Sequence, residues 1–390
     1  MPDFKTTTVR CRVLTTRLGM RLLPTLACAA LVAACGRSDT RAADSTLAAR
    51  PMAIDSGLAA DSAGARSQAG GRTRIGRDQQ RVLDELSALH GKPIEGLSAA
   101  EARKQPSPAD AVLALLKKDG KPTMPEAVGS VDDRTIPGPG GALPVRIYTP
   151  AGSGPFPVIV YFHGGGFVIA TNDTYDGSAR ALTNAAKAII VSVEYRKAPE
   201  HKFPAAHDDA LAAWKWVVAN AKSLRGDTAH IAIAGESAGG NLAVATAVSA
   251  KALGLSTPVA ILAVYPITQH DTTTQSYTEN ATAKPLSRSM MTWFFDKYTR
   301  TSADGENPRL NLLRADLTGL PPTTIVTAQF DPLRSDGDML ADRLKAAGVS
   351  VEIRNFNGVA HEFFGQGALV PAAREAVAYA AGGLRKSLSP

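Results

Sequence analysis

Short apolar runs alternate with helix-like segments from about residue 143 to the C-terminal region. The runs are rich in residues that favour strands, and several of them are apolar on both faces, as buried parallel strands are. They predict seven strands, at residues 143–148, 158–162, 188–193, 230–234, 259–265, 323–328 and 351–356. Between them apolar residues repeat with a period near 3.6, as Leu211, Trp214 and Val218 do, and predict helices. This alternation favours an α/β fold with a doubly wound, mostly parallel sheet.

Two segments depart from the alternation. Residues 82–89 repeat at helical spacing and residues 109–116 follow two prolines, so we expect two short amphipathic helices ahead of the sheet. Residues 267–311 are polar at first and then dense in Met and aromatic residues, which indicates an insertion over the sheet. Its cluster at residues 290–298 suits either core packing or an acyl-binding pocket.

The first 35 residues form a separate unit. Residues 1–34 carry five cations and one acid, and they end in a 13-residue apolar stretch that Pro24 interrupts. Such a stretch is short for a bilayer span and fits a signal peptide. The segment ends with Val-Ala-Ala-Cys at residues 32–35, which resembles the bacterial lipoprotein box. We therefore expect Cys35 to be lipidated. An ordinary secretory signal is the alternative, and Met20 is an alternative start.

Residues 36–72 consist mostly of Ala, Gly, Ser and Thr with scattered Arg and Asp, and contain no aromatic residue. Such a composition buries too little apolar surface to offset the entropy of ordering, so it predicts a flexible tether between lipid and domain. Gly36 after the cysteine resembles the pattern of outer-membrane delivery in diderm bacteria. We therefore expect a lipid-anchored protein of the cell envelope.

Composition and charge exclude several classes of protein. The 390 residues are 44% hydrophobic and 20% charged, which is typical of a globular chain. Residues 81–390 hold 31 Lys and Arg against 30 Asp and Glu, so they give no sign of a nucleic-acid-binding face. All three cysteines lie within the first 35 residues, which excludes a disulfide framework or cysteine metal site beyond them. No metal-binding or nucleotide-binding motif appears, and we expect neither metal nor cofactor.

A candidate nucleophile lies in Gly-Glu-Ser-Ala-Gly at residues 235–239, which follows a predicted strand and opens a predicted helix. A G-x-S-x-G sequence makes a tight strand-to-helix turn that exposes the serine oxygen, since its glycines let the two backbones approach. A plain glycine-rich turn is the alternative. The strand and helix on either side favour Ser237 as a nucleophile.

A second glycine-rich turn, His-Gly-Gly-Gly at residues 163–166, directly follows the strand at 158–162. Consecutive glycines leave backbone N–H groups free to converge on an oxyanion, where charge develops when an acyl carbonyl is attacked. We interpret His163 as a structural orienter. A glycine-rich strand end without a ligand is the alternative.

A base and an acid should follow the serine in such a fold. Of seven histidines, only His361 lies on a loop just after a late predicted strand, and Asp331 follows the strand at 323–328. The order Ser237, Asp331, His361 is that of α/β-hydrolases. The rival acids Asp336 and Asp338 fall inside a predicted helix, where we expect solvated carboxylates.

Four motifs together resemble the hormone-sensitive-lipase-like esterases, bacterial lipolytic family IV, over about residues 80–388. They are the two glycine-rich turns, Tyr-Arg-Lys-Ala-Pro-Glu at 195–200, and Asp-Pro-Leu at 331–333. The resemblance implies an α/β-hydrolase fold and hydrolysis of short-chain or aryl carboxylic esters without cofactor. It implies a cap built from the N-terminal helices and the insertion. The implied oxyanion donors are the N–H groups of Gly165, Gly166 and Ala238, with Gly164 a weaker candidate.

Three residues depart from the family pattern. Lys197 replaces an apolar residue, Ser335 stands where an acid is common, and Glu362 follows the candidate base where glycine is common. None is a reacting group, but the charge of Glu362 would raise the pKa of His361.

These features divide the chain into a signal peptide (1–34), a tether (35–76), cap helices (77–126) and a hydrolase domain (127–390) with its insertion at about 267–311. The expected partners are a small-molecule ester and, through the lipid, a membrane. A homodimer is left open. An amidase or peptidase could use the same triad, because pocket shape selects the leaving group. An envelope lipoprotein that binds without catalysis is the second alternative.

Overall fold

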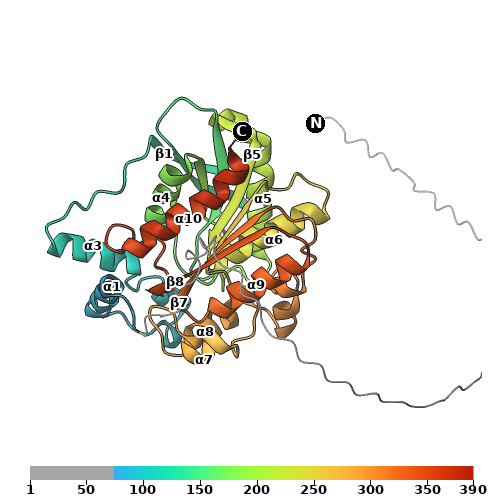
Figure 1. Ribbon diagram of the computed structural model, residues 1–390. Helices are drawn as coiled ribbons and strands as arrows, with labels where there is room; N and C mark the ends of the chain where they lie inside the picture. The colour runs from blue at the N-terminus through green and yellow to red at the C-terminus, as the bar shows by residue number, and fades with distance from the viewer. Residues whose placement is uncertain (1–73, 390) are drawn as a thin grey trace, which may run out of the picture. The chain divides into compact units, whose positions relative to one another are not determined.

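The computed structural model describes residues 74–389 (Figure 1). The predicted signal peptide, the lipidation site Cys35 and the tether up to residue 73 lie outside these residues. Within 74–389, no helix combines the length and the apolarity needed to cross a membrane.

Eight strands form one sheet in the order β1-β2-β4-β3-β5-β6-β7-β8. Strands β3 to β8 pair in parallel, whereas β1 pairs with β2 and β2 with β4 in the antiparallel sense. The fold is therefore the doubly wound, mostly parallel sheet that the sequence predicts. The strands are β1 Ser130–Gly138, β2 Gly141–Thr149, β3 Phe156–Phe162, β4 Ile189–Val193, β5 Gly226–Glu236, β6 Ile261–Val264, β7 Thr323–Phe330 and β8 Val351–Ala360.

Helices cover both faces of the sheet (Figure 1). Side chains of α4 and α10 pack into one buried cluster, and those of α5, α6 and α9 pack into the other. The α-helices are α1 Arg77–Ala88, α2 Ala99–Ala102, α3 Pro108–Lys118, α4 Asp176–Ala186, α5 Ala205–Asn220, α6 Ala238–Ala252, α7 Gln275–Glu279, α8 Arg288–Tyr298, α9 Arg334–Ala346 and α10 Pro371–Leu388. Four short 3₁₀ helices add η1 Ile94–Gly96, η2 Ala221–Leu224, η3 Ser302–Glu306 and η4 Leu312–Arg314.

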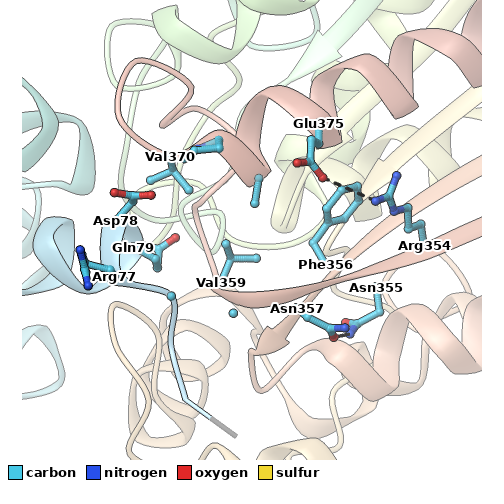
Figure 2. A pocket seen from close by; sticks show the side chains of 14 residues that line it. Arg77, Asp78, Gln79, Arg354, Asn355, Phe356, Asn357, Val359, Val370 and Glu375 are labelled. Atoms are coloured by element: carbon cyan, nitrogen blue, oxygen red, sulfur yellow. Dashed lines mark hydrogen bonds and ion pairs between the residues drawn. The ribbon is translucent and has the colours of Figure 1, made fainter. Parts of the chain in front are cut away.

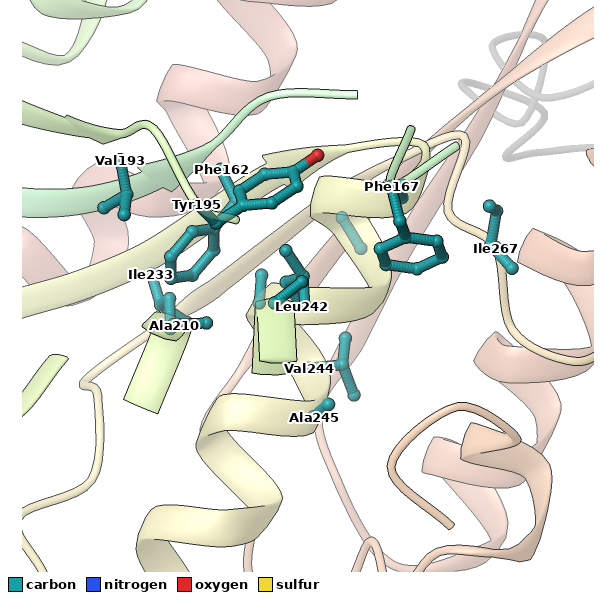
Figure 3. Packing of buried hydrophobic residues seen from close by; sticks show 14 of the residues in the cluster. Phe162, Phe167, Val193, Tyr195, Ala210, Ile233, Leu242, Val244, Ala245 and Ile267 are labelled. Carbon is teal, nitrogen blue, oxygen red and sulfur yellow. The ribbon is translucent and has the colours of Figure 1, made fainter. Parts of the chain in front are cut away.

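The central strands are apolar on both faces because both faces are buried. In β3, Val160 and Phe162 belong to one cluster and Ile159 and Tyr161 to the other, and each is at most 1% exposed. Figure 3 shows Phe162 and Ile233 of the sheet near Leu242 of α6. Successive strand residues point to opposite sides, so only a continuous apolar run satisfies both layers.

One strand was not predicted. Strand β1 reads Ser-Val-Asp-Asp-Arg-Thr-Ile-Pro-Gly, and only its Ile136 is buried. It lies at the edge of the sheet and is defined by backbone pairing with β2 from Ser130 opposite Thr149 to Gly138 opposite Gly141. Because its side chains are mostly exposed, it carries no hydrophobic pattern to read.

The N-terminal helices and the insertion meet on the side of the candidate site. The indole N–H of Trp293 in α8 donates to the Leu97 carbonyl at 3.2 Å, and the Ser289 hydroxyl donates to Glu95 at 2.9 Å. The Met and aromatic cluster packs into the core, and part of it also lines a cavity, so the core-packing interpretation is confirmed and acyl binding stays a prediction. Trp293, Phe295 and Tyr298 are buried in the core; Met291 and Phe294 belong to the same core cluster and, together with Met290, also line a cavity.

Asn241 of α6 fixes both ends of the insertion. Its amide N–H₂ donates to the carbonyls of Ile267 and Leu310 at 3.0 and 2.9 Å, and its carbonyl oxygen lies 2.9 Å from Nε2 of His207. His207 is buried, and burial lowers its pKa to about 3, so the ring is neutral and acts as a structural hydrogen-bonding group. The segment over the sheet is thus anchored one turn of helix after Ser237.

Candidate active site

The candidate residues gather at the carboxyl ends of parallel strands. Ser237 follows β5, Asp331 follows β7, His361 follows β8, and the glycine-rich turn at 163–166 follows β3. Strand β3 lies between β4 and β5, so the chain reverses its winding direction there. Crevices at such a switch point are the usual ligand sites of open α/β sheets.

Ser237 adopts a backbone conformation that its neighbours make available. Its φ of 56° and ψ of −117° lie outside the common regions for a side-chain-bearing residue. A Cβ at Gly235 would meet the Gly239 carbonyl oxygen at 2.1 Å, and one at Gly239 would meet the Phe162 carbonyl oxygen at 1.9 Å. Both positions therefore require glycine. The turn presents the serine hydroxyl at the carboxyl end of β5.

Ser237, His361 and Asp331 form a continuous hydrogen-bonded chain. His361 Nε2 lies 3.0 Å from Ser237 Oγ, and its Nδ1 lies 2.7 Å from Asp331 Oδ2. The other carboxylate oxygen of Asp331 accepts the Leu333 backbone N–H at 2.8 Å. Exposure of the three residues is 4%, 3% and 0%, respectively. With Nδ1 protonated toward Asp331, Nε2 is free to accept the serine proton.

The charges around His361 favour its protonated form. Burial lowers the pKa of His361, but the charge and hydrogen bond of Asp331, together with the charges of Glu362 and Glu236, outweigh burial and raise it above its usual value. The Tyr265 ring lies against the imidazole, with 4.5 Å between ring centroids. The site therefore stabilises the imidazolium that forms when the serine is deprotonated.

The second glycine-rich turn lies beside the serine. Gly165 and Gly166, with φ of 92° and 58°, line the same cavity as Ser237, whereas Gly164 and Ala238 are not among its lining residues. A Cβ at Gly166 would meet the Phe294 ring at 2.3 Å. The left-handed backbone and the close approach both explain why these positions are glycine.

His163 supports this turn from behind. It is fully buried, its Nδ1 lies 2.8 Å from the Gly164 carbonyl, and its ring stacks on Tyr195 at 4.4 Å. The Tyr195 hydroxyl donates to the carbonyls of His163 and Gly164 at 2.9 and 3.0 Å. Burial lowers the pKa of His163 to about 4, so it is neutral at physiological pH. These contacts fix the carbonyls of the turn.

A cavity of about 600 Å³ opens above the serine. That size is ordinary for a small-molecule site. Ile94 from the N-terminal segment and Met290, Met291 and Phe294 from α8 give it an apolar side. Its polar side includes Thr171, Thr174, Tyr175, Lys197 and Glu362.

A network of buried acids and tyrosines behind the site was not predicted. Glu236 accepts the hydroxyls of Tyr161 and Tyr265 at 2.6 and 2.5 Å, and burial raises its pKa to about 7. Tyr175 donates to Glu362 at 2.5 Å. Tyr175 and Tyr265 belong to no motif, and nothing in the sequence signals that they converge on these carboxyls.

Each of the three residues that depart from the family pattern makes a contact in the structure. Lys197 forms an ion pair with Glu194 and donates to the Ala170 carbonyl at 2.8 Å. Ser335 accepts the Ser276 backbone N–H at 3.1 Å. The carboxylate oxygen Oε1 of Glu362 lies 4.0 Å from His361 Nε2.

The expectation for one rival acid was wrong. Asp338 is exposed as expected, but Asp336 is 0% exposed. Its Oδ1 accepts the backbone N–H and hydroxyl of Thr268 at 3.1 and 3.0 Å. Helix α9 places Asp336 on its inner side, under the start of the insertion, and the helical pattern alone did not reveal this contact.

Two further features of the described residues are the lack of a metal-binding cluster and a second cavity. Within residues 74–389, no three His, Cys, Asp or Glu side chains are arranged to hold a metal ion. A second cavity of about 620 Å³ lies between the start of α1, the edge strand β8 and the start of α10 (Figure 2). Arg354 and Glu375 form an ion pair on its wall, and its lining includes none of the residues singled out from the sequence.

Comparison with known proteins gives consistent matches. The family model described as the alpha/beta hydrolase fold matches residues 159–365. Carboxylesterase NlhH of Mycobacterium tuberculosis is 42% identical over 264 residues, covering 66% of this chain and 83% of its own. The ethyl acetate hydrolase of Pseudomonas putida is 32% identical over 301 residues, covering 76% and 92%. The hyperthermophilic esterase from the archaeon Pyrobaculum calidifontis superposes with a TM-score of 0.74 at 36% identity, over 80% of this chain and 98% of that one.

Proposed function

The chain belongs to the family of the alpha/beta hydrolase fold, and on that basis we propose that it is a serine carboxylesterase acting on short-chain or aryl esters. The observation that carries this proposal is the hydrogen-bonded chain from Ser237 through His361 to Asp331 beneath a cavity of about 600 Å³. The names of its relatives, a carboxylesterase and an ethyl acetate hydrolase, support the same class of substrate.

In the proposed reaction Ser237 Oγ attacks the ester carbonyl carbon while its proton passes to His361 Nε2. The carbonyl oxygen becomes an oxyanion that accepts the N–H groups of Gly165, Gly166 and Ala238. His361 then gives the proton to the leaving alcohol, and the carbon–oxygen bond breaks to leave an acyl-enzyme. Water, deprotonated by the same imidazole, attacks the acyl-enzyme and releases the acid. Asp331 holds the tautomer and stabilises the imidazolium.

Hydrolysis of a p-nitrophenyl ester series by the protein and by Ser237→Ala tests the proposal. Removing the nucleophile costs on the order of 10⁶ in rate in a serine hydrolase, leaving only what the oxyanion donors and binding supply. An organophosphonate should label the parent protein and fail to label the variant. Unchanged circular dichroism would exclude misfolding. Full turnover by the alanine variant would contradict the assignment.

Two alternatives give different results in the same experiment. An amidase or peptidase would hydrolyse anilides or peptides with a higher kcat/KM than matched esters. A binding protein that only retains the fold would leave all substrates unhydrolysed and take no phosphonate label. The left-handed strain at Ser237 argues against the second alternative, since strained backbone of this kind persists where it serves a function.

For location, we propose attachment to a membrane through a lipid on Cys35, facing the periplasm or cell surface. The support is in the sequence: a basic start, a short apolar stretch, and Val-Ala-Ala-Cys at residues 32–35. The tether that follows would let the hydrolase domain reach substrates away from the membrane surface.

A further inference from the structure

Glu362 places a carboxylate inside the candidate site. Its backbone is left-handed, with φ of 66°, and its side chain is 22% exposed and lines the cavity together with Ser237 and His361. Oε1 accepts the Tyr175 hydroxyl at 2.5 Å. Within residues 74–389, no group donates to Oε2, and that oxygen is not among the fully enclosed polar atoms. One oxygen is therefore held, and the other is available to a ligand.

The position of this carboxylate relative to the reaction follows from the proton path. In ester hydrolysis His361 Nε2 must reach the leaving oxygen to return the proton to it. The alcohol portion of the ester therefore lies on the Nε2 side of the cavity. Glu362 Oε1 is 4.0 Å from Nε2, so the first few atoms of the alcohol pass close to the carboxylate.

The other charged side chains around the cavity are either paired or peripheral. Lys197 is paired with Glu194, and Arg103 is paired with Glu200 at 2.7 Å. The remaining charged residues of the lining are exposed to solvent: Lys92, Glu95 and Lys284. Among the carboxylates that line the cavity in the described part of the chain, Glu362 is thus the one beside the reacting atoms, and it forms no ion pair with Lys or Arg.

We propose that Glu362 selects the alcohol portion of the substrate, favouring alcohols that carry a cationic group near the ester oxygen over neutral alcohols of the same shape. The inference rests on the proposed ester hydrolysis. A cation within about 6 Å of the carboxylate, in surroundings between bulk water and protein interior, gains about tenfold in kcat/KM. Burial and the charge of Asp331 raise the pKa of Glu362 above its usual value, although His361 and Tyr175 oppose them, so the ionised fraction of Glu362 grows with pH and the assays are run on the alkaline side of neutrality.

The test compares acetylcholine with 3,3-dimethylbutyl acetate, in which carbon replaces the quaternary nitrogen. The ratio of their kcat/KM values cancels effects of a substitution on His361 itself. We expect this ratio to fall about tenfold in Glu362→Gln. Glu362→Gly, which suits the left-handed backbone, should give the same fall if glutamine perturbs the fold. Glu95→Gln, which removes an equal charge from the exposed rim, should leave the ratio unchanged.

The outcomes separate the two proposals. If Ser237→Ala abolishes hydrolysis of the neutral ester but both Glu362 variants keep the parent ratio, the esterase assignment stands and the selectivity proposal is overturned. An equal fall in Glu95→Gln would also overturn it, since the effect would then reflect the general charge of the cavity. If the parent protein hydrolyses neither ester nor any other carboxylic ester, both proposals fail together.

Discussion

Replacing Asp336 with asparagine should remove a pH dependence from the stability of the fold. Asp336 is 0% exposed, its Oδ1 accepts two hydrogen bonds from Thr268, and its Oδ2 has no partner within the described residues. Burial raises its pKa from 3.8 to about 8. The folded protein therefore holds a neutral acid there at neutral pH, whereas the unfolded chain exposes an ionised one. Asparagine keeps the shape, the Thr268 acceptor and the neutral state.

The sign and size follow from linkage. The folded state binds the proton more tightly, so the stability from protonated Asp336 is fully present below about pH 3.8 and is lost as pH rises through about 8. Each unit of pKa difference corresponds to about 1.4 kcal/mol, so the parent should lose about 4 kcal/mol from this group between pH 5 and pH 8. Asp336→Asn should lack this loss and gain on the parent by the same amount.

Urea unfolding at both pH values measures the effect, with equal m-values as the condition for comparison. The control is Asp342→Asn on the same helix, whose side chain is 81% exposed. It should follow the parent at both pH values. If the unfolding free energies of the parent and Asp336→Asn change in parallel with pH, Asp336 is not a neutral buried acid and the reasoning is refuted.

Two further predictions concern location and substrate. Cys35→Ser should release the protein from the membrane fraction, and sedimentation with membranes after a high-salt wash would contradict lipid anchoring. Acyl chains of about two to eight carbons should be preferred, because each methylene that fits gains about 0.8 kcal/mol while one that overfills the cavity causes strain. Specificity constants for p-nitrophenyl esters from acetate to palmitate measure this. A maximum at laurate or longer would indicate an open, lipid-binding groove along α8.

The fold was predictable where burial imposes a pattern. Strands β3 to β7 carry apolar runs because helices cover both of their faces, and each of these runs was predicted from the sequence. The edge strand β8 was also predicted, although its first five residues are only partly buried. Strand β1 was not, because eight of its nine residues escape full burial and its position depends on backbone pairing with β2. A strand that is stabilised by backbone pairing and has mostly exposed side chains shows no hydrophobic pattern in its sequence.

The site was predictable where chain order constrains it. The fold family presents nucleophile, acid and base in a fixed order at strand ends, and the structure brings Ser237, Asp331 and His361 together there. The tyrosines that contact Glu236 could not be found this way. Tyr161 and Tyr265 are 75 and 29 residues from it, and each contact depends on strand register rather than on a motif.

Asp331 and Asp336 show that burial alone does not decide the role of an acid, because the groups around each carboxyl differ. Both are 0% exposed, and they lie five residues apart across the start of α9. Asp331 accepts a hydrogen bond from the ring of His361, which can become a cation, so its negative charge gains a compensating partner as the reaction proceeds. Asp336 has only the neutral donors of Thr268, and the charge of Asp331 further raises its pKa. A second anion beside Asp331 would add a buried charge that no cation offsets, so the neutral form of Asp336 is the one that the fold stabilises.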